Sequence, residues 1–146
     1  MRVLIDSNIL ISAAYSKGST PHQAFKKAVE PPYHGLICEQ SLEELRRVYK
    51  RKFPDKIQIF ELFISTMRSL VEVVPVPPSP HPEESEIRDI DDRPILRAAI
   101  TAKADILLTG DKDFLESTIT YPKIMTAAQF IQANSEISID PSVQHE

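Results

Sequence analysis

Short apolar runs alternate with longer amphipathic segments along most of this chain. Runs of this length that are bounded by turn-forming residues are typical of buried strands. Strands are therefore predicted at residues 2–6, 35–38, 71–76 and 105–111, and Ile124-Met125 fits a final edge strand.

The amphipathic segments between these runs predict helices. Their expected starts are Asp6-Ser7-Asn8, Thr20 with Pro21 behind it, Ser41, Asp55, Pro94 and Thr126. The helix from Asp55 to about Leu70 has apolar residues around so much of its surface that we expect most of it to be buried.

This alternation of strands and helices favours a single α/β domain with a mostly parallel sheet. We expect the domain to cover residues 1–134, and the polar segment 135–146 to be a flexible tail. Residues 77–86 hold four prolines and three glutamates, so an exposed and mobile loop is predicted there.

Composition narrows the functional classes. The chain has 146 residues, a formal charge of -4 and one cysteine, which excludes an internal disulfide and fits a reducing compartment. No apolar run approaches the roughly 20 residues that cross a bilayer, and the segment before Asp6 is too short for a signal peptide. A cytoplasmic protein without membrane contact is predicted.

Carboxylates occur at four places beside a strand end or a helix start: Asp6, Glu43/Glu44, Asp91/Asp92 and Asp111/Asp113. The carboxyl ends of parallel strands meet at one edge of a sheet, where crevices form. Hard cations such as Mg²⁺ and Mn²⁺ prefer these oxygen ligands, and a cation would offset the repulsion between the acids. Asp6 and Asn8 would share a face if the first strand continued through them.

Each acid also has a purely structural interpretation. Asp6 and Asp111 could cap the helices that follow them. Ser41 and Glu44 have the spacing of a capping box, and Asp91 and Asp92 suit the start of any helix. The combination of all these acids on one small sheet makes capping alone a poor explanation.

Basic residues follow Ser41 along the same predicted helix. Arg46, Arg47 and Lys50 could contact the phosphates of a nucleic acid, or could form the solvated face of an amphipathic helix. Lys112 could likewise contact a phosphate or only neutralise the aspartates on either side of it.

Taken together, four motifs resemble the four acidic motifs of PIN domains, in their order and spacing. They are Asp6-Ser7-Asn8, Ser41-Leu42-Glu43-Glu44-Leu45, Asp91-Asp92-Arg93-Pro94-Ile95-Leu96 and Thr109-Gly110-Asp111-Lys112-Asp113-Phe114. The resemblance extends from about Arg2 to Ala133. It is closest to small VapC-like PIN ribonucleases, described as toxins of toxin–antitoxin systems.

This resemblance implies a three-layer α/β/α sandwich, a Mg²⁺ or Mn²⁺ cofactor, a homodimer and a protein antitoxin as partner. It implies metal-binding roles for Asp6, Glu44, Asp92, Asp111 and Asp113. Asn8, Asp91 and Thr109 would support them, Thr109 by orienting a carboxylate or a water. Glu43 stays open as an alternative to Glu44.

The predicted function is that of a metal-dependent endoribonuclease that hydrolyses RNA phosphodiester bonds, with Asp6, Glu44, Asp92 and Asp111 as its catalytic acids. The alternative is a non-catalytic PIN-fold module that binds RNA or a protein. A phosphatase of the haloacid dehalogenase type would need an Asp-x-Asp motif where the chain has Asp6-Ser7-Asn8. Three glycines in the whole chain cannot make a dinucleotide-binding turn.

Overall fold

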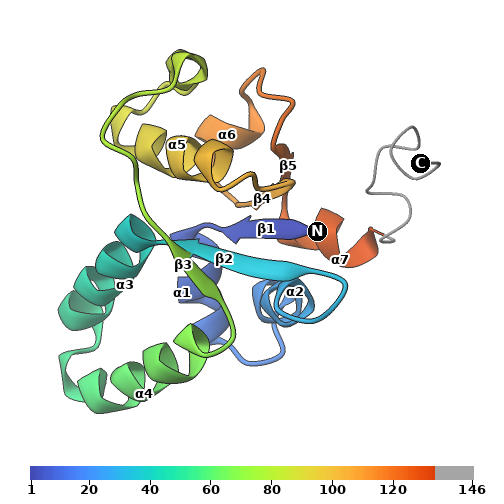
Figure 1. Cartoon of the computed structure of the whole chain (residues 1–146). Helices are drawn as coiled ribbons and strands as arrows, with labels where there is room; N and C mark the ends of the chain where they lie inside the picture. The colour runs from blue at the N-terminus through green and yellow to red at the C-terminus, as the bar shows by residue number, and fades with distance from the viewer. Residues whose placement is uncertain (134–146) are drawn as a thin grey trace.

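Parallel strands form the centre of the molecule, which a computed structural model describes over residues 1–133 (Figure 1). The strands are β1 (Arg2–Ile5), β2 (His34–Cys38), β3 (Glu72–Val74), β4 (Ile106–Leu108) and β5 (Lys123–Met125). They make one sheet in the order β3-β2-β1-β4-β5, and every pairing is parallel. The predicted parallel sheet is confirmed, with β5 at an edge.

The order of the strands places a topological switch point at the centre of the sheet. From β1 the chain moves outward through β2 to β3, and then returns to the other side of β1 to form β4 and β5. Val3 in β1 pairs with Gly35 on one side and with Ile106 on the other. In open α/β sheets, ligands bind beyond the carboxyl ends of the strands at such a point.

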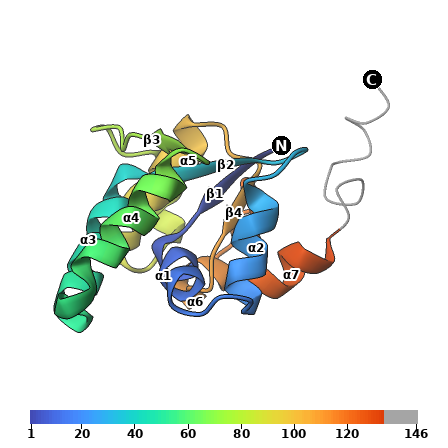
Figure 2. The same ribbon diagram turned by 90° about the horizontal axis from the view of Figure 1, so that it is seen from below.

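One face of the sheet is covered by the helices that connect β1, β2 and β3, together with the last described helix (Figures 1 and 2). These are α1 (Ser7–Tyr15), α2 (Thr20–Ala28), α3 (Glu39–Lys52), α4 (Ile57–Arg68) and α7 (Ala127–Gln132), with a 3-10 turn, η1 (Pro54–Lys56), before α4. Val3, Ile5 and Ile37 project from the sheet into this larger core, where they meet Leu10 and Phe60.

The opposite face carries a thinner layer that contains α5 (Arg93–Thr101) and α6 (Lys112–Leu115). The 3-10 turns η2 (Pro82–Glu86) and η3 (Ile90–Asp92) precede α5. Leu4, Leu36 and Leu107 point from the sheet into this core, and Leu96 and Phe114 fill it from the helices. The three-layer α/β/α sandwich is therefore confirmed.

The expected cap of α2, Thr20, and the expected start of α3, Ser41, were wrong, although α2 does begin at Thr20. Ser19 rather than Thr20 caps α2, because its side chain accepts a hydrogen bond from the His22 amide at 3.3 Å. α3 begins at Glu39, two residues before Ser41. Ser41 is fully buried inside the helix, and its Oγ has no hydrogen-bond partner among the described residues. The capping-box interpretation of Ser41 and Glu44 is therefore excluded.

α4 is not mostly buried, as its composition had suggested. Phe60, Ile64 and Met67 face the core, but Ile59 and Leu62 are 67% and 70% exposed. The reason is the layered architecture, in which a helix has only one face against the sheet and its neighbours.

The segment between β3 and α5 also differs from the predicted loop. It contains η2, and Glu84 in this turn is buried. Within the described residues no helix is both long and apolar enough to span a membrane. The predicted domain boundary at residue 134 and the tail at 135–146 lie outside the described residues.

Candidate metal site

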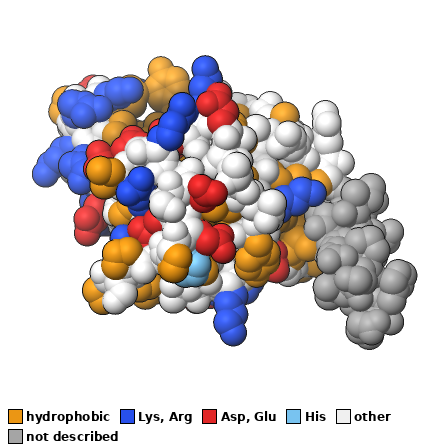
Figure 3. All heavy atoms as spheres, turned by 90° about the horizontal axis from the view of Figure 1, so that it is seen from above, with side chains coloured by type: hydrophobic (Ala, Val, Ile, Leu, Met, Phe, Trp, Pro, Cys, Tyr) orange, Lys and Arg blue, Asp and Glu red, His pale blue; other side chains and the backbone are white. Residues whose placement is uncertain are grey.

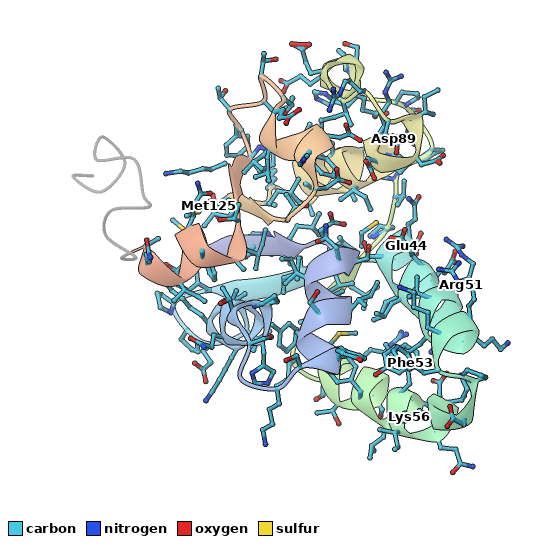
Figure 4. All side chains as sticks on the ribbon, turned by 180° about the vertical axis from the view of Figure 1, so that it is seen from behind. Glu44, Arg51, Phe53, Lys56, Asp89 and Met125 are labelled. Atoms are coloured by element: carbon cyan, nitrogen blue, oxygen red, sulfur yellow. The ribbon has the colours of Figure 1, made fainter. Side chains whose placement is uncertain are left out.

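A pocket of about 870 Å³ opens at the carboxyl edge of the sheet, beside the switch point. The four acids predicted to be catalytic all line it: Asp6, Glu44, Asp92 and Asp111. Other lining residues come from the start of α1, from α3, from the segment before α5 and from the first turn of α5. Figure 4 shows Glu44 on α3 and Asp89 on the segment before α5, which stand on opposite sides of this opening.

Asp6 follows β1 directly and serves as the N-cap of α1. One carboxylate oxygen accepts a hydrogen bond from the Ser7 amide at 2.8 Å, and the other accepts one from the Thr109 hydroxyl at 2.7 Å. Asp6 is only 6% exposed, and this burial raises its pKa to about 6. Asp6 therefore both caps α1 and lines the pocket.

Asn8 does not share a strand face with Asp6, because β1 ends at Ile5 and Asn8 lies in the first turn of α1. Asn8 nevertheless lines the pocket. Its side-chain oxygen accepts a long hydrogen bond of 3.4 Å from the Gly110 amide, and so connects the first turn of α1 with the end of β4.

Thr109 links the two central strand ends. Besides donating to Asp6, its buried hydroxyl accepts a hydrogen bond from the Asp111 amide at 3.0 Å. Asp111 in turn caps α6 by accepting from the Asp113 amide at 2.8 Å. The orientation of the Asp6 carboxylate is therefore set by one side chain and one backbone amide.

Glu44 is half-buried on α3, and its carboxylate accepts a short hydrogen bond from the Ser7 hydroxyl. Glu43 also lines the pocket but is exposed, so the contact with Ser7 distinguishes Glu44 from its neighbour. Sequence reasoning missed Ser7. The available signal was a hydroxyl residue directly after Asp6.

Asp92 ends η3 and immediately precedes α5. Burial raises its pKa to about 8, and the nearby Asp111 carboxylate adds to the shift. Its Oδ2 atom is buried and has no hydrogen-bond partner among the described residues. Asp91, its exposed neighbour, also lines the pocket.

Asp113 lies to one side of these acids and is not among the residues that line the pocket. Its Oδ1 accepts hydrogen bonds from Arg88 at 2.8 and 3.1 Å. Asp89, Asp92 and Asp113 each offer a carboxylate oxygen, and these atoms lie within 4.8 Å of one another. Asp89 was missed as a site residue, although it stands three positions before Asp92 in an acid-rich stretch.

Among the predicted phosphate-binding residues, only Arg47 lines the acidic pocket. Arg46 forms an ion pair of 3.4 Å with Glu61 and, with Lys50, borders a separate hollow of about 170 Å³ between α3 and α4. Lys112 is exposed outside the pocket lining. Figure 3 shows basic side chains gathered at the end of the molecule where α3 lies.

The donor set fits a divalent cation. None of Asp6, Glu44, Asp92 and Asp111 forms an ion pair with a basic side chain in the described part of the chain. Oxygen ligands without basic partners, including the unpaired Oδ2 of Asp92, are what Mg²⁺ and Mn²⁺ prefer.

Comparisons with known proteins identify the family and the fold. The family profile described as PIN domain matches residues 2–113. A search of curated proteins found no match. Among solved structures, the chain is similar to one in VapBC2 from Rickettsia felis bound to a DNA fragment from their promoter. The TM-score is 0.66 at 16% identity, over 86% of this chain and 98% of the other.

Proposed function

Because the chain belongs to the PIN domain family, we propose that it is a metal-dependent endoribonuclease that hydrolyses RNA phosphodiester bonds. The observation that carries the proposal is the pocket in which Asp6, Glu44, Asp92 and Asp111 gather without a basic partner. Burial raises the pKa values of Asp6 and Asp92, the neighbouring carboxylates raise them further, and a bound cation would offset this cost of charging the acids.

Asp6, Glu44, Asp92 and Asp111 would hold Mg²⁺ or Mn²⁺. A bound ion would supply Lewis-acid polarisation of a phosphate and a more acidic water. Thr109 and Ser7 fix the carboxylates of Asp6 and Glu44 through their hydroxyl groups. The exposed guanidinium of Arg47 can bind a phosphate of the RNA at the rim of the pocket.

The test combines Mn²⁺ titration with cleavage of single-stranded RNA, for the wild type and for Asp92→Asn. We expect the wild type to bind Mn²⁺ and to cleave RNA, and the variant to lose both. The variant keeps the volume of the side chain, so its fold should be intact. A wild type that neither binds Mn²⁺ nor cleaves RNA would contradict the proposal.

The alternative is a PIN-fold module that binds RNA or a protein without cleaving. The presence of the four predicted catalytic acids in one pocket favours the enzyme. Binding of RNA without cleavage, equally strong in the wild type and in Asp92→Asn, would favour the module.

We further propose that the protein is a toxin of a toxin–antitoxin pair that acts in the cytoplasm and binds a protein antitoxin. The family and the likeness to a VapBC2 chain support this proposal. Expression of the chain alone should arrest growth, and co-expression of a small protein encoded next to it should restore growth and co-purify with it. Arrest that persists in Asp92→Asn would argue against nuclease toxicity.

Self-association into a homodimer is proposed as well. Its support is the pair of exposed apolar side chains on α4, Ile59 and Leu62. Sedimentation of the wild type and of Leu62→Lys would test it, with a monomeric wild type as the contradicting result.

A further inference from the structure

The pocket wall that carries Asp89 and Asp92 belongs to the segment 75–92, between β3 and α5. The only regular elements in this segment are the 3-10 turns η2 and η3. Because no strand ladder holds it, its position depends on contacts made by side chains.

Arg97, in the second turn of α5, makes three of these contacts. Its Nε and one terminal nitrogen donate to the two oxygens of Glu84 at 2.8 and 2.9 Å. The other terminal nitrogen donates to the carbonyl oxygen of Pro77 at 2.9 Å. The Arg97 and Glu84 side chains are 16% and 6% exposed, so this bidentate pair is largely shielded from water.

Glu84 extends the connection, because its carboxylate also accepts a hydrogen bond from the His81 amide. Pro77 and Glu84 are thus bonded directly to one guanidinium, and His81 is connected to it through the Glu84 carboxylate. The hydrogen bond from Arg97 lowers the pKa of Glu84, which keeps the carboxyl charged.

The residues bonded to Arg97 are followed in the chain by the acids of the pocket. Three residues beyond Glu84, Ile87 is fully buried, and its carbonyl oxygen accepts from Arg93 Nε at 2.9 Å. Asp89 follows two residues later, where its carboxylate accepts from the Asp91 amide at 2.9 Å. The Asp89 carboxylate adds to the raised pKa of Asp92, so the position of this segment affects the charge on the acids of the pocket.

We infer that Arg97 is a positioning residue that, through Glu84 and Pro77, holds the segment that leads to Asp89 against α5 and so sets the affinity of the pocket for a divalent cation. Neither Arg97 nor Glu84 lines the pocket, so neither touches the ion or the RNA. The inference rests on the proposed function, because it requires that the acids bind a metal.

The experiment measures binding of Mn²⁺ alone to the wild type, Arg97→Met and Arg97→Lys, with thermal unfolding in parallel. Residues that support metal ligands from outside commonly change affinity by about 10- to 100-fold. We therefore expect Arg97→Met to bind Mn²⁺ at least about tenfold more weakly. Arg97→Lys keeps the charge but not the planar fork, so its affinity should lie between the two.

Lys27→Met is the matched control. The Lys27 ammonium donates to the carbonyl oxygen of Phe130 at 2.6 Å and to that of Ile131 at 3.3 Å, at the end of α7 on the other face of the sheet. Its loss should lower Tm while leaving Mn²⁺ affinity unchanged. This separates an effect on the pocket from a general loss of stability.

Wild-type Mn²⁺ affinity in folded Arg97→Met would overturn the inference and leave the proposed function intact. If Arg97→Met does not fold, Glu84→Gln replaces it, and unchanged affinity in that variant has the same meaning. A wild type that binds no Mn²⁺ rejects both the inference and the proposed function. Faster hydrogen exchange at the Asp91 and Asp92 amides in Arg97→Met, with α7 unchanged, would support the inference.

Discussion

Asp6 and Asp92 face the same pocket, but the elements that carry them are held in place in different ways. Asp6 stands at the end of the central strand, and its backbone amide bonds to Leu108 of the neighbouring strand at 3.0 Å. Asp92 stands at the end of a segment without strand pairing, which Arg97 ties to α5 through Glu84. One wall of the pocket is thus part of the sheet, and the other depends on long side chains.

The difference indicates where the site can be perturbed from a distance. Displacing Asp6 requires that hydrogen bonds of a buried ladder break, and such cores open only with much of the global free energy of unfolding. Displacing Asp92 and Asp89 requires the loss of a few side-chain contacts on the thinner layer. A substitution at the end of β1 should therefore weaken metal binding by removing a ligand. A substitution near the segment 75–92 should weaken it by displacing the ligands.

The largest effect is expected from Asp6→Asn, in the sheet wall. Asparagine still caps a helix, so α1 should keep its start. Because the folded pKa of Asp6 is raised to about 6 from 3.8, the charged form is disfavoured in the fold at pH 7. We expect Mn²⁺ binding and cleavage to be lost, with a Tm equal to or above that of the wild type.

Cleavage by Asp6→Asn at the wild-type rate would show that Asp6 is not a catalytic residue. A large fall in Tm would show instead that the carboxylate is needed for the fold. Calorimetry and an RNA cleavage assay on the same preparation distinguish these results.

The contrast between the walls also explains what the sequence could predict. A short apolar run followed by an aspartate places that acid at a strand end, so Asp6 and Asp111 were assigned to the sheet edge from local pattern alone. The pocket beyond β1 and β4 follows from the strand order. The α/β class and the parallel sheet were predictable for the same reason.

The other wall was not predictable from local pattern. Four prolines and a run of acids in residues 77–86 suggested an exposed, mobile loop, but Glu84 is buried against Arg97, 13 residues away. A contact between residues so far apart leaves no periodic signal. The hydrogen bond from Ser7 to Glu44, which joins α1 with α3, was missed for the same physical reason.

A smaller effect is expected from Thr109→Val, which keeps the shape of the buried side chain but removes its hydroxyl. Asp6 then loses the hydrogen bond that orients one carboxylate oxygen. We expect Mn²⁺ affinity to fall by about 10- to 100-fold, as for other residues that orient metal ligands. Thr109→Ser keeps the hydroxyl and should bind Mn²⁺ nearly as the wild type does. Equal affinity in Thr109→Val and Thr109→Ser would contradict this role.

The ion pair between Arg97 and Glu84 should make the free energy of unfolding depend on pH. The folded pKa of Glu84 lies below its usual value of 4.5, because Arg97 bonds to the ionised carboxylate. Glu84 therefore adds to stability above pH 4.5, and this contribution is lost as the pH falls through the folded pKa. The difference in free energy of unfolding between the wild type and Glu84→Gln should be largest near neutral pH and shrink below pH 4.5. A constant difference across this range would contradict the assignment.

The smallest effect, and one of opposite sign, is expected from Arg88→Ala. The exposed Arg88 guanidinium pairs with Asp113, whose carboxylate lies within 4.8 Å of those of Asp89 and Asp92. Since a guanidinium and a divalent cation compete for the same carboxylate, removing Arg88 should tighten Mn²⁺ binding. Exposed ion pairs contribute up to about 1 kcal/mol, so the gain should be no more than about fivefold.

Glu116→Ala is the control for this gain, because it removes the other acid bound to Arg88 and leaves Asp113 paired. Mn²⁺ affinity should then stay at the wild-type value. Added salt screens exposed pairs, so the advantage of Arg88→Ala should shrink as ionic strength rises. Weaker Mn²⁺ binding in Arg88→Ala would instead mean that Arg88 supports the acids, as Arg97 does, and that both basic residues hold the same wall.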